Sequence, residues 1–249
     1  MTSLACTFFI SLSASFLLTI LVRQVAIHRG VLDSPDGFRK RHVGRVPLFG
    51  GVAVYAAVVL GLIWARHAGF GSGYELNELS AVVIAMAGFA CFFGCIDDVR
   101  RLSPRQKLLL QTGAVLPLVL AGFRVYSVVL FGDTFDLGWL GIPLTILWFV
   151  GCINAINLLD GMDGLASLVG LAAAMTLGVI AGYTGNGHVS AAAVVLAGAL
   201  AGFFLHNRPP ARIFLGDSGS MVLGVVLGIL GIQSTLKTST TLSITAPLV

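Results

Sequence analysis

The sequence predicts an all-α membrane protein that crosses the bilayer several times, and three observations lead to this fold class. Of the 249 residues, 57% are hydrophobic and 10% are charged, whereas a soluble domain carries roughly 25% charged residues. The mean hydropathy is +0.95. Apolar runs recur along the chain, and each is close to the ~20 residues that cross the hydrocarbon core of a bilayer. So few charged groups cannot cover a water-facing globule, which excludes soluble, disordered and nucleic-acid-binding proteins.

Eight apolar runs are predicted to form transmembrane helices. In order, they cover residues 4–25, 48–65, 79–96, 107–123, 140–156, 165–183, 189–205 and 219–236. The first run is preceded by no basic residue and is longer than the apolar part of a signal peptide, so we expect a retained helix. Between the fourth and fifth runs, residues 126–137 alternate around Gly132, Asp133 and Thr134, which predicts a small hairpin on the outer, periplasmic side.

A ninth apolar run covers the last eight residues, 242–249. A helix of that length reaches about 12 Å. We therefore expect it to be the start of a further transmembrane helix, and the sequence to lack its C-terminal part.

The distribution of charge predicts the orientation of the chain in the membrane. Successive helices cross in opposite directions, so every second loop lies on the same side of the membrane. The loops on one side carry 12 Lys and Arg residues, and those on the other side carry 3. The positive-inside rule puts the richer side in the cytoplasm and the N-terminus outside. The 12 residues are Arg23, Arg29, Arg39, Lys40, Arg41, Arg45, Arg100, Arg101, Arg105, Lys107, Arg208 and Arg212.

Carboxylates gather at predicted helix ends in three segments that are far apart in the sequence. They are Asp97 with Asp98, Asp160 with Asp163, and Asp217. All three segments are predicted to lie on the basic, cytoplasmic side. Carboxylates at a membrane boundary are costly unless they are solvated, paired or metal-bound. This pattern therefore predicts that the carboxylates meet cations.

Each carboxylate segment also has a simpler explanation. Asp97 and Asp98 repel each other, and the Arg and Lys residues that follow within ten positions would form a local ion-pair network with them. Asp217, among glycines at a helix start, would serve as a helix cap. Asp160 and Asp163 would share a face of a helix, but the glycines that follow each of them favour a turn that brings backbone close to another group.

Taken together, the carboxylates, Asn154, Asn157 and Asn207, and the nearby cations suggest a hard-cation site beside groups that bind anions. Mg²⁺ fits best, with Mn²⁺ as the alternative, because it takes oxygen ligands from one or two carboxylates and from substrate phosphates. The sequence contains no Walker loop, dinucleotide fingerprint or zinc-binding helix. The pattern therefore implies a phosphorylated substrate that is handled at the cytoplasmic membrane surface.

Four motifs resemble those of the bacterial polyprenyl-phosphate N-acetylhexosamine-1-phosphate transferases, a glycosyltransferase 4 type family, and the likeness covers nearly the whole chain. They are Phe-Arg-Lys-Arg-His-x-Gly-x-Val-Pro-Leu-x-Gly-Gly at 38–51, Asp97-Asp98 followed by Leu102-Ser103-Pro104 and Lys107-Leu108-Leu109, Asn157-Leu-Leu-Asp160-Gly-Met-Asp163-Gly-Leu, and Gly216-Asp217-Ser-Gly-Ser. The sequence resembles the UDP-N-acetylglucosamine undecaprenyl-phosphate transferases more than the muramoyl-pentapeptide transferase. The latter has Lys soon after the paired Asp and Thr before the Asp-Gly, where this chain has Arg100-Arg101 and Leu159.

The resemblance implies a single transmembrane catalytic domain over residues 1–249 in the bacterial cytoplasmic membrane, with its site facing the cytoplasm. Undecaprenyl phosphate would attack the sugar-linked phosphorus of a UDP-N-acetylhexosamine and release UMP. It further implies that Asp97 activates the lipid phosphate, that Asp98 supports it or the metal, and that Asp217 binds Mg²⁺. The nucleotide and diphosphate pocket would be shaped by Asn157, Asp160, Asp163 and Asn207. Further contacts with substrate would come from Phe214 on uracil, Lys107 on phosphate, and Arg41 and His42.

Several alternatives remain open at this point. The muramoyl-pentapeptide transferase belongs to the same superfamily. A secondary transporter of an anionic phosphorylated solute would share the apolar spans, although transport sites lie near the bilayer midplane. A catalytically silent scaffold is the third alternative.

Family members also carry a His-x-His-His motif, which none of the five histidines here reproduces. The loop cations, including Arg41, would serve topology alone or also bind phosphates. Membrane lipids are expected partners, nucleic acids are not, and a homo-oligomer is compatible with the sequence.

Overall fold

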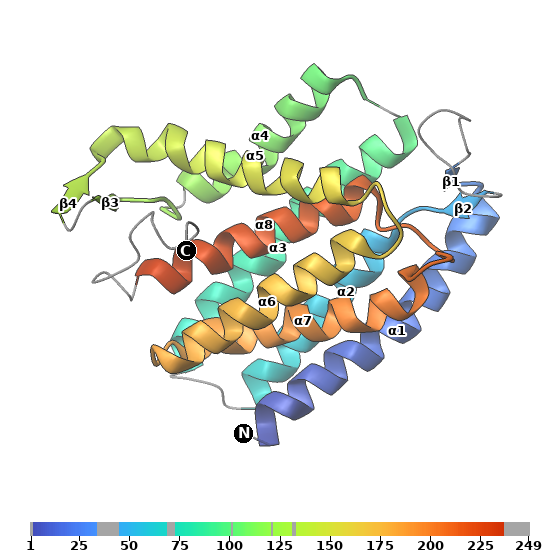
Figure 1. Cartoon of the computed structure of the whole chain (residues 1–249), viewed down its shortest axis with the longest axis horizontal. Helices are drawn as coiled ribbons and strands as arrows, with labels where there is room; N and C mark the ends of the chain where they lie inside the picture. The colour runs from blue at the N-terminus through green and yellow to red at the C-terminus, as the bar shows by residue number, and fades with distance from the viewer. Residues whose placement is uncertain are drawn as a thin grey trace.

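The computed structural model describes residues 2–33, 45–68, 73–100, 102–120, 122–130 and 133–236, and all eight predicted helices are present in it (Figure 1). The helices are α1 Thr2–Arg29, α2 Gly50–His67, α3 Gly73–Arg100, α4 Pro104–Leu120, α5 Gly141–Leu159, α6 Leu165–Tyr183, α7 Gly187–Asn207 and α8 Gly216–Leu236. A short 3₁₀ turn, η1 Gly138–Leu140, leads into α5. The predicted all-α membrane fold is confirmed. The run at 242–249 lies outside the described residues.

Seven of these helices are long and apolar enough to cross a membrane, and α4 is the exception. It has 17 residues and begins with Pro104, Arg105, Gln106 and Lys107. These polar residues shorten its apolar part, because a helix that crosses the core needs about 20 apolar residues. The fourth crossing and the sidedness of the chain stay predictions.

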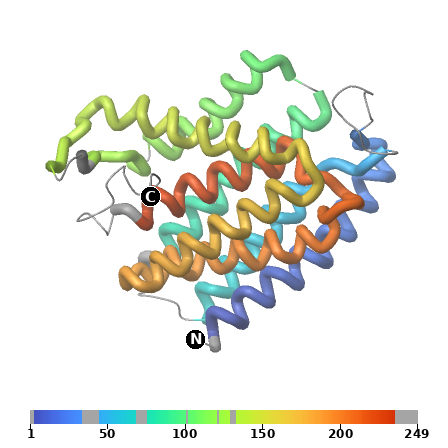
Figure 2. Tube along the Cα trace, viewed as in Figure 1, coloured from blue at the N-terminus to red at the C-terminus, as the bar shows by residue number. Residues whose placement is uncertain are grey.

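The helices α7 and α8 form the centre of the molecule. In their most apolar windows 78% and 72% of residues are buried, the highest shares among the seven spans. Helices α1 and α6 pack on α7, while α3 and α5 pack on α8, and α2 contacts both central helices. Helix α4 packs chiefly on α3 and α5. Helices α4 and α5 run along one edge of the molecule (Figures 1 and 2).

Glycines allow the central helices to come close to their neighbours. A Cβ on Gly198 or Gly202 of α7 would collide with the backbone carbonyls of α1, and one on Gly224 of α8 would lie 2.5 Å from the Cα of Ile153 in α5. Small residues at such crossings let helix backbones approach in a membrane. These glycines therefore serve helix packing.

Two small hairpins mark opposite ends of the helices. Strand β3 Ser127–Leu130 pairs with β4 Asp133–Asp136 in antiparallel register, which confirms the predicted hairpin. At the other end β1 Leu32–Asp33 pairs with β2 Val46–Pro47. Two-residue strands leave no alternation in a sequence, so this second ladder was not predicted.

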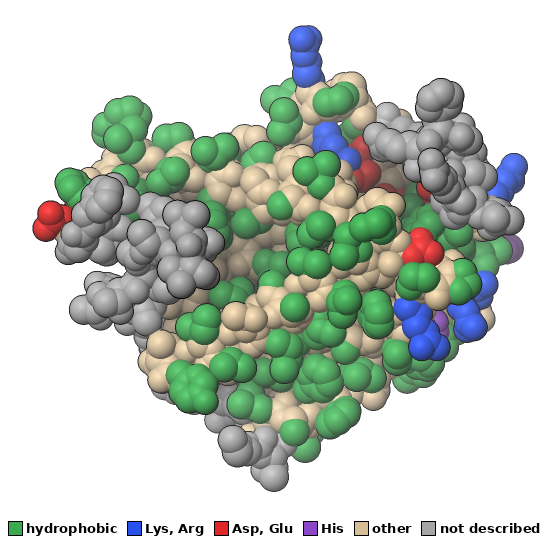
Figure 3. Space-filling view, in the orientation of Figure 1, with side chains coloured by type: hydrophobic (Ala, Val, Ile, Leu, Met, Phe, Trp, Pro, Cys, Tyr) green, Lys and Arg blue, Asp and Glu red, His purple; other side chains and the backbone are tan. Residues whose placement is uncertain are grey.

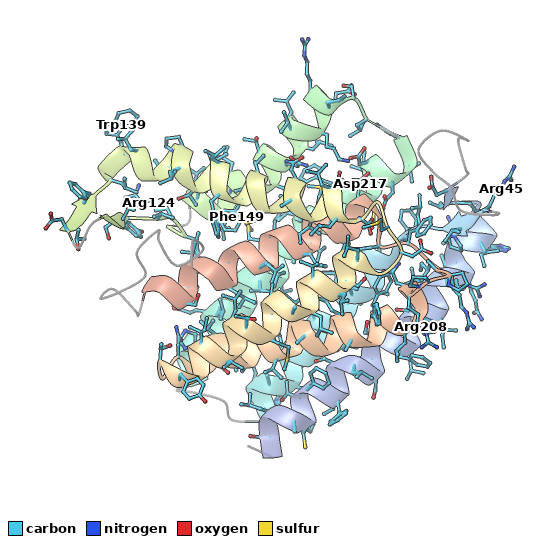
Figure 4. All side chains as sticks on the ribbon, viewed as in Figure 1. Arg45, Arg124, Trp139, Phe149, Arg208 and Asp217 are labelled. Carbon is cyan, nitrogen blue, oxygen red and sulfur yellow. The ribbon has the colours of Figure 1, made fainter. Side chains whose placement is uncertain are left out.

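More of the charged side chains lie toward one end of the molecule than toward the other (Figure 4). In Figure 4, Arg45, Arg208 and Asp217 lie toward the β1–β2 end, whereas Arg124 and Trp139 lie at the opposite end. Apolar side chains cover much of the body between the ends on the face drawn in Figure 3. This distribution agrees with the one-sided charge pattern of the sequence.

Candidate active site

Lys107 is the cation that joins two of the predicted carboxylate segments. Its Nζ lies 3.1 Å from Asp97 Oδ2, at the end of α3, and 2.5 Å from Asp217 Oδ1, at the start of α8. Asp97 is 4% exposed, while Lys107 and Asp217 are each about a fifth exposed, at 22% and 23%. A carboxylate this deeply buried needs a cation beside it. The expected meeting of carboxylates and cation is confirmed, and for Asp97 the partner is Lys107.

Asn157, on α5, adds a fourth helix to the cluster that Asp97, Lys107 and Asp217 form. Its Nδ2 donates to the same Asp217 oxygen at 2.5 Å and also to Ser220 Oγ at 3.1 Å. One oxygen therefore accepts from both α4 and α5 while it is carried by α8. Figure 4 places Asp217 at the end of the molecule where these helices meet. Charge-assisted bonds of this kind are roughly twice as strong as neutral ones.

Asp98 acts on the backbone at the start of α8. Its Oδ1 accepts the N–H of Asp217 at 2.7 Å, and its Oδ2 accepts that of Ser218 at 3.2 Å. A carboxylate at a helix N-terminus satisfies free N–H groups and is favoured by the helix dipole. The cap of α8 is thus Asp98, from a distant helix, and the alternative that Asp217 serves only as a cap does not hold.

Asp160 and Asp163 lie in the turn that the glycines predict between α5 and α6. Asp160 Oδ2 accepts the N–H of Gly216 at 3.1 Å, and Asp163 Oδ2 accepts that of Ala211 at 2.9 Å. Both carboxylates therefore hold the connection between α7 and α8. Burial raises the pKa of Asp160 well above its usual range, and the neighbouring charges of Asp98, Asp217 and Asp163 add to the rise, whereas the Gly216 bond opposes it.

The glycines of this region are required by close backbone contacts. Gly216 has a φ of +75°, and a Cβ on it would lie 2.8 Å from both carboxylate oxygens of Asp98. A side chain at Gly94 would lie 2.6 Å from the carbonyl oxygen of Asp217. The close approach predicted for the glycines after Asp160 and Asp163 is found at Gly164, which has a φ of +75° and where a Cβ would lie 2.9 Å from the Phe204 ring. At Gly161 the nearest atom to such a Cβ is at an ordinary 3.6 Å.

Asn207 and Phe214 lie in the framework around this cluster. Asn207 Oδ1 accepts from Ser167 Oγ at 2.6 Å, and its Nδ2 donates to Ile213 O at 2.9 Å. The backbone of Phe214 donates to Pro47 O at 2.8 Å and accepts from Gly50 N at 3.0 Å. The Pro-Leu-x-Gly-Gly motif therefore packs its backbone on the start of α8, which sequence reasoning missed. The substrate contacts expected of Asn207 and Phe214 stay predictions.

Two predicted substrate-binding residues, Arg41 and His42, lie outside the described residues. Ser218 and Ser220 are additions that sequence reasoning did not name as site residues. The signal was present, since both lie in the Gly-Asp-Ser-Gly-Ser motif, but the partner of each hydroxyl or amide could not be known before the helices were placed.

The donor chemistry of this cluster suits a hard cation that shares its ligands with phosphate. Asp97 Oδ2 and Asp217 Oδ1 already face one positive group, the Lys107 ammonium. Among the described residues, no three side chains of His, Cys, Asp or Glu form a metal site by themselves. Mg²⁺ usually takes only one or two carboxylates and completes its shell with water and substrate oxygens. The residues therefore fit Mg²⁺ bound together with a diphosphate.

Comparison with known proteins gives one family. The family model of glycosyl transferase family 4 matches residues 79–235. The chain is 34% identical over 245 residues to a probable undecaprenyl-phosphate N-acetylglucosaminyl 1-phosphate transferase of Bacillus subtilis (strain 168), covering 97% of this chain and 66% of the relative. It is 30% identical over 245 residues to the phospho-N-acetylmuramoyl-pentapeptide-transferase of Streptococcus thermophilus (strain CNRZ 1066), covering 88% and 70%. The chain spans about two thirds of the length of these curated relatives.

Proposed function

Because this chain belongs to glycosyl transferase family 4, we propose that it transfers a sugar 1-phosphate from a UDP-sugar to a polyprenyl phosphate. The lipid phosphate oxygen forms a bond to the sugar-linked phosphorus, the bond from that phosphorus to the bridging oxygen breaks, and UMP leaves. The product is a lipid pyrophosphoryl sugar. We propose undecaprenyl phosphate as the acceptor and the cytoplasmic membrane face as the place of reaction.

The observation that carries this proposal is the meeting of two acidic segments, distant in the sequence, at one lysine. Lys107 contacts Asp97 and Asp217, Asn157 contacts Asp217, and Asp98 caps the helix that carries Asp217. Phosphoryl transfer needs little covalent chemistry from a protein, but it needs charge stabilisation and positioning. A fixed cation beside ordered carboxylates at a helix start supplies both.

In this mechanism each side chain has one task. Asp97 accepts the remaining proton of the lipid phosphate and so keeps it nucleophilic. Lys107 contacts the phosphates and offsets the charge that crowds at the reacting phosphorus. Asp217, supported by Asp98, would hold Mg²⁺, and the bound ion would supply positive charge to the diphosphate of the donor. Asn157 fixes the orientation of the Asp217 carboxylate.

Two donors are supported by particular relatives. The 34% identity to a probable N-acetylglucosaminyl 1-phosphate transferase favours UDP-N-acetylglucosamine. The 30% identity to a phospho-N-acetylmuramoyl-pentapeptide-transferase favours the UDP-linked muramoyl pentapeptide. We propose the N-acetylglucosamine donor first, because this chain has Arg100-Arg101 and Leu159 where the resemblance described above gives the muramoyl-pentapeptide transferases Lys and Thr.

The test is UMP release by the purified chain in lipid nanodiscs. Undecaprenyl phosphate and Mg²⁺ are supplied with either UDP-N-acetylglucosamine or the muramoyl-pentapeptide donor. We expect UMP with the first donor only when lipid phosphate and Mg²⁺ are both present. UMP from the second donor alone would assign the alternative, and no UMP from either, beside an active relative, would refute the proposed activity. Solute flux in vesicles without transfer would support a transporter.

A further inference from the structure

A second polar contact joins α4 and α5 below the carboxylates. Asn154 Nδ2 donates to Gln111 Oε1 at 2.8 Å and to the Val150 carbonyl at 2.8 Å. Gln111 is fully buried, with 0% of its surface exposed. Its Nε2 is buried and has no hydrogen-bond partner among the described residues. The reaction described above makes no use of either amide.

The spacing of these residues connects the amide pair to the site. Gln111 follows Lys107 by four positions on α4, and Asn154 precedes Asn157 by three on α5, so each amide lies one turn from a site residue on the same helix face. Both upper side chains, Lys107 and Asn157, donate to Asp217 Oδ1. The two helices therefore meet in two successive layers, the upper one at Asp217 and the lower one at the amide pair.

Apart from Lys107 and Gln111, the buried side chains of α4 are apolar. The helix packs chiefly on α3 and α5, and it leaves several large apolar side chains on the surface. They are Leu108, Leu109, Leu116 and Leu120. Apolar contacts in a lipid-facing helix tolerate sliding, because lipid tails replace them at little cost, whereas a polar contact between helices is directional. The amide pair is therefore the contact suited to fix α4 along α5.

We infer that Gln111 and Asn154 are positioning residues that set the height of α4 against α5, so that the Lys107 ammonium reaches the Asp217 oxygen held by Asn157. The inference rests on the proposed function for its catalytic consequence. Stability alone does not explain the pair, since a buried amide donor without a partner is destabilising. The benefit must lie in geometry, where a displacement of about 1 Å lowers a rate on the order of a hundredfold.

The first test measures geometry without catalysis. The chain has three lysines, Lys40, Lys107 and Lys237, and reductive methylation followed by peptide mass spectrometry gives the reaction rate of each. In Gln111→Met and in Asn154→Leu, we expect Lys107 to react on the order of tenfold faster, because its ammonium is no longer held against Asp217. The other two lysines are internal references. Leu118→Met, at a buried position further along α4, is the matched control and should leave the rate unchanged.

The second test separates positioning from folding. The melting temperature of Gln111→Met should equal or exceed that of the parent, because the change removes a buried unpartnered donor. In the UMP assay its kcat should fall on the order of tenfold with little change in KM for the UDP-sugar. The double variant Gln111→Met/Asn154→Leu should be no worse than either single variant, since both remove the same contact.

The outcomes are distinguishable from failure of the proposed function. If the parent releases no UMP, that function fails, and the Lys107 methylation rate still decides the present inference. Unchanged methylation of Lys107 in both single variants would overturn it. So would a lowered melting temperature with unchanged Lys107 reactivity, because the amides would then serve stability only.

Discussion

At the residue scale, the sequence indicated which charged side chains come together but not which contacts they make. Asp97, Asp98 and Asp217 were predicted to meet cations, and four basic residues within ten positions of Asp98 were candidates. The structure selects Lys107 for Asp97 and Asp217. Asp98 instead satisfies two N–H groups of α8. These choices depend on helix packing, which periodicity and composition do not encode.

Asp217→Asn should abolish most of the activity while the protein stays folded. The change keeps the shape of the side chain but removes the charge that faces Lys107 and the proposed Mg²⁺. We expect UMP release to fall by a factor on the order of 10³, as for other charge-stabilising groups. Asp136→Asn is the control, because its exposed carboxylate lies in β4, at the end of the molecule opposite to the start of α8 (Figure 1). An equal loss in both variants would count against the special role of Asp217.

Lys107→Met should lower stability as well as activity, because it leaves Asp97 and Asp217 without their shared cation. Breaking a buried ion pair costs about 3–5 kcal/mol. Since Lys107 is 22% exposed, solvent screening reduces this to about 1–3 kcal/mol. Thermal unfolding in detergent measures it. Lys107→Arg should recover part of the stability, and a melting temperature equal to that of the parent in Lys107→Met would contradict the ion pair.

At the element scale, hydropathy was enough to find all eight helices, since each apolar run is long and lies between polar turns. It did not predict the β1–β2 ladder. It placed the fourth helix at 107–123, three residues later than α4 at Pro104–Leu120, because the first turn of α4 is polar and charged. It also could not predict which helix ends touch. The start of α8 and the residues just before it are held by Asp98 from α3, Asp160 from the α5–α6 turn, and Gly50 and Gly51 at the start of α2.

Gly94→Ala tests the contact between α3 and α8. A Cβ at this position would lie 2.6 Å from the Asp217 carbonyl oxygen, so α3 must shift and draw Asp98 away from the N–H groups that it caps. Overpacking of this kind costs about 1–3 kcal/mol. We expect a lower melting temperature and a loss of UMP release.

Gly113→Ala is the matched control in a neighbouring helix. No atom lies within 4 Å of a Cβ built on Gly113. An added methyl group on an exposed helix position should be neutral or stabilise by up to about 1 kcal/mol. If Gly94→Ala were as well tolerated as Gly113→Ala, the close approach of α3 to α8 would be wrong.

At the scale of the whole molecule, the one-sided distribution of charge allowed the convergence of distant acidic segments to be predicted. Alternating helices place the ends of α3, α5 and α7 on one side, and contacts of Asp97, Asp98 and Asp160 with the start of α8 or with Lys107 bring the segments together. Figure 4 shows Asp217 at this end. The sequence did not predict which helices pack against each other. Each helix is apolar on all sides, so no face of it indicates a particular partner.

The sidedness of the membrane protein can be measured with single cysteines. In a background with Cys6, Cys91, Cys95 and Cys152 replaced, Arg208→Cys should react with an impermeant maleimide only from the cytoplasmic side. Arg124→Cys, at the opposite end (Figure 4), should react only from the outside. Reaction of both from the same side would exclude the orientation that the charge distribution predicts.

The central claim is that the end of α3 and the start of α8 form one binding site for a divalent ion and a diphosphate. Electron paramagnetic resonance of Mn²⁺ in the presence of UDP tests it most directly. We predict one tightly bound ion per chain, with affinity reduced at least about tenfold in Asp217→Asn and in Asp98→Asn but retained in Asp136→Asn, the control in β4. Equal Mn²⁺ affinity in the parent and all three variants would contradict the account.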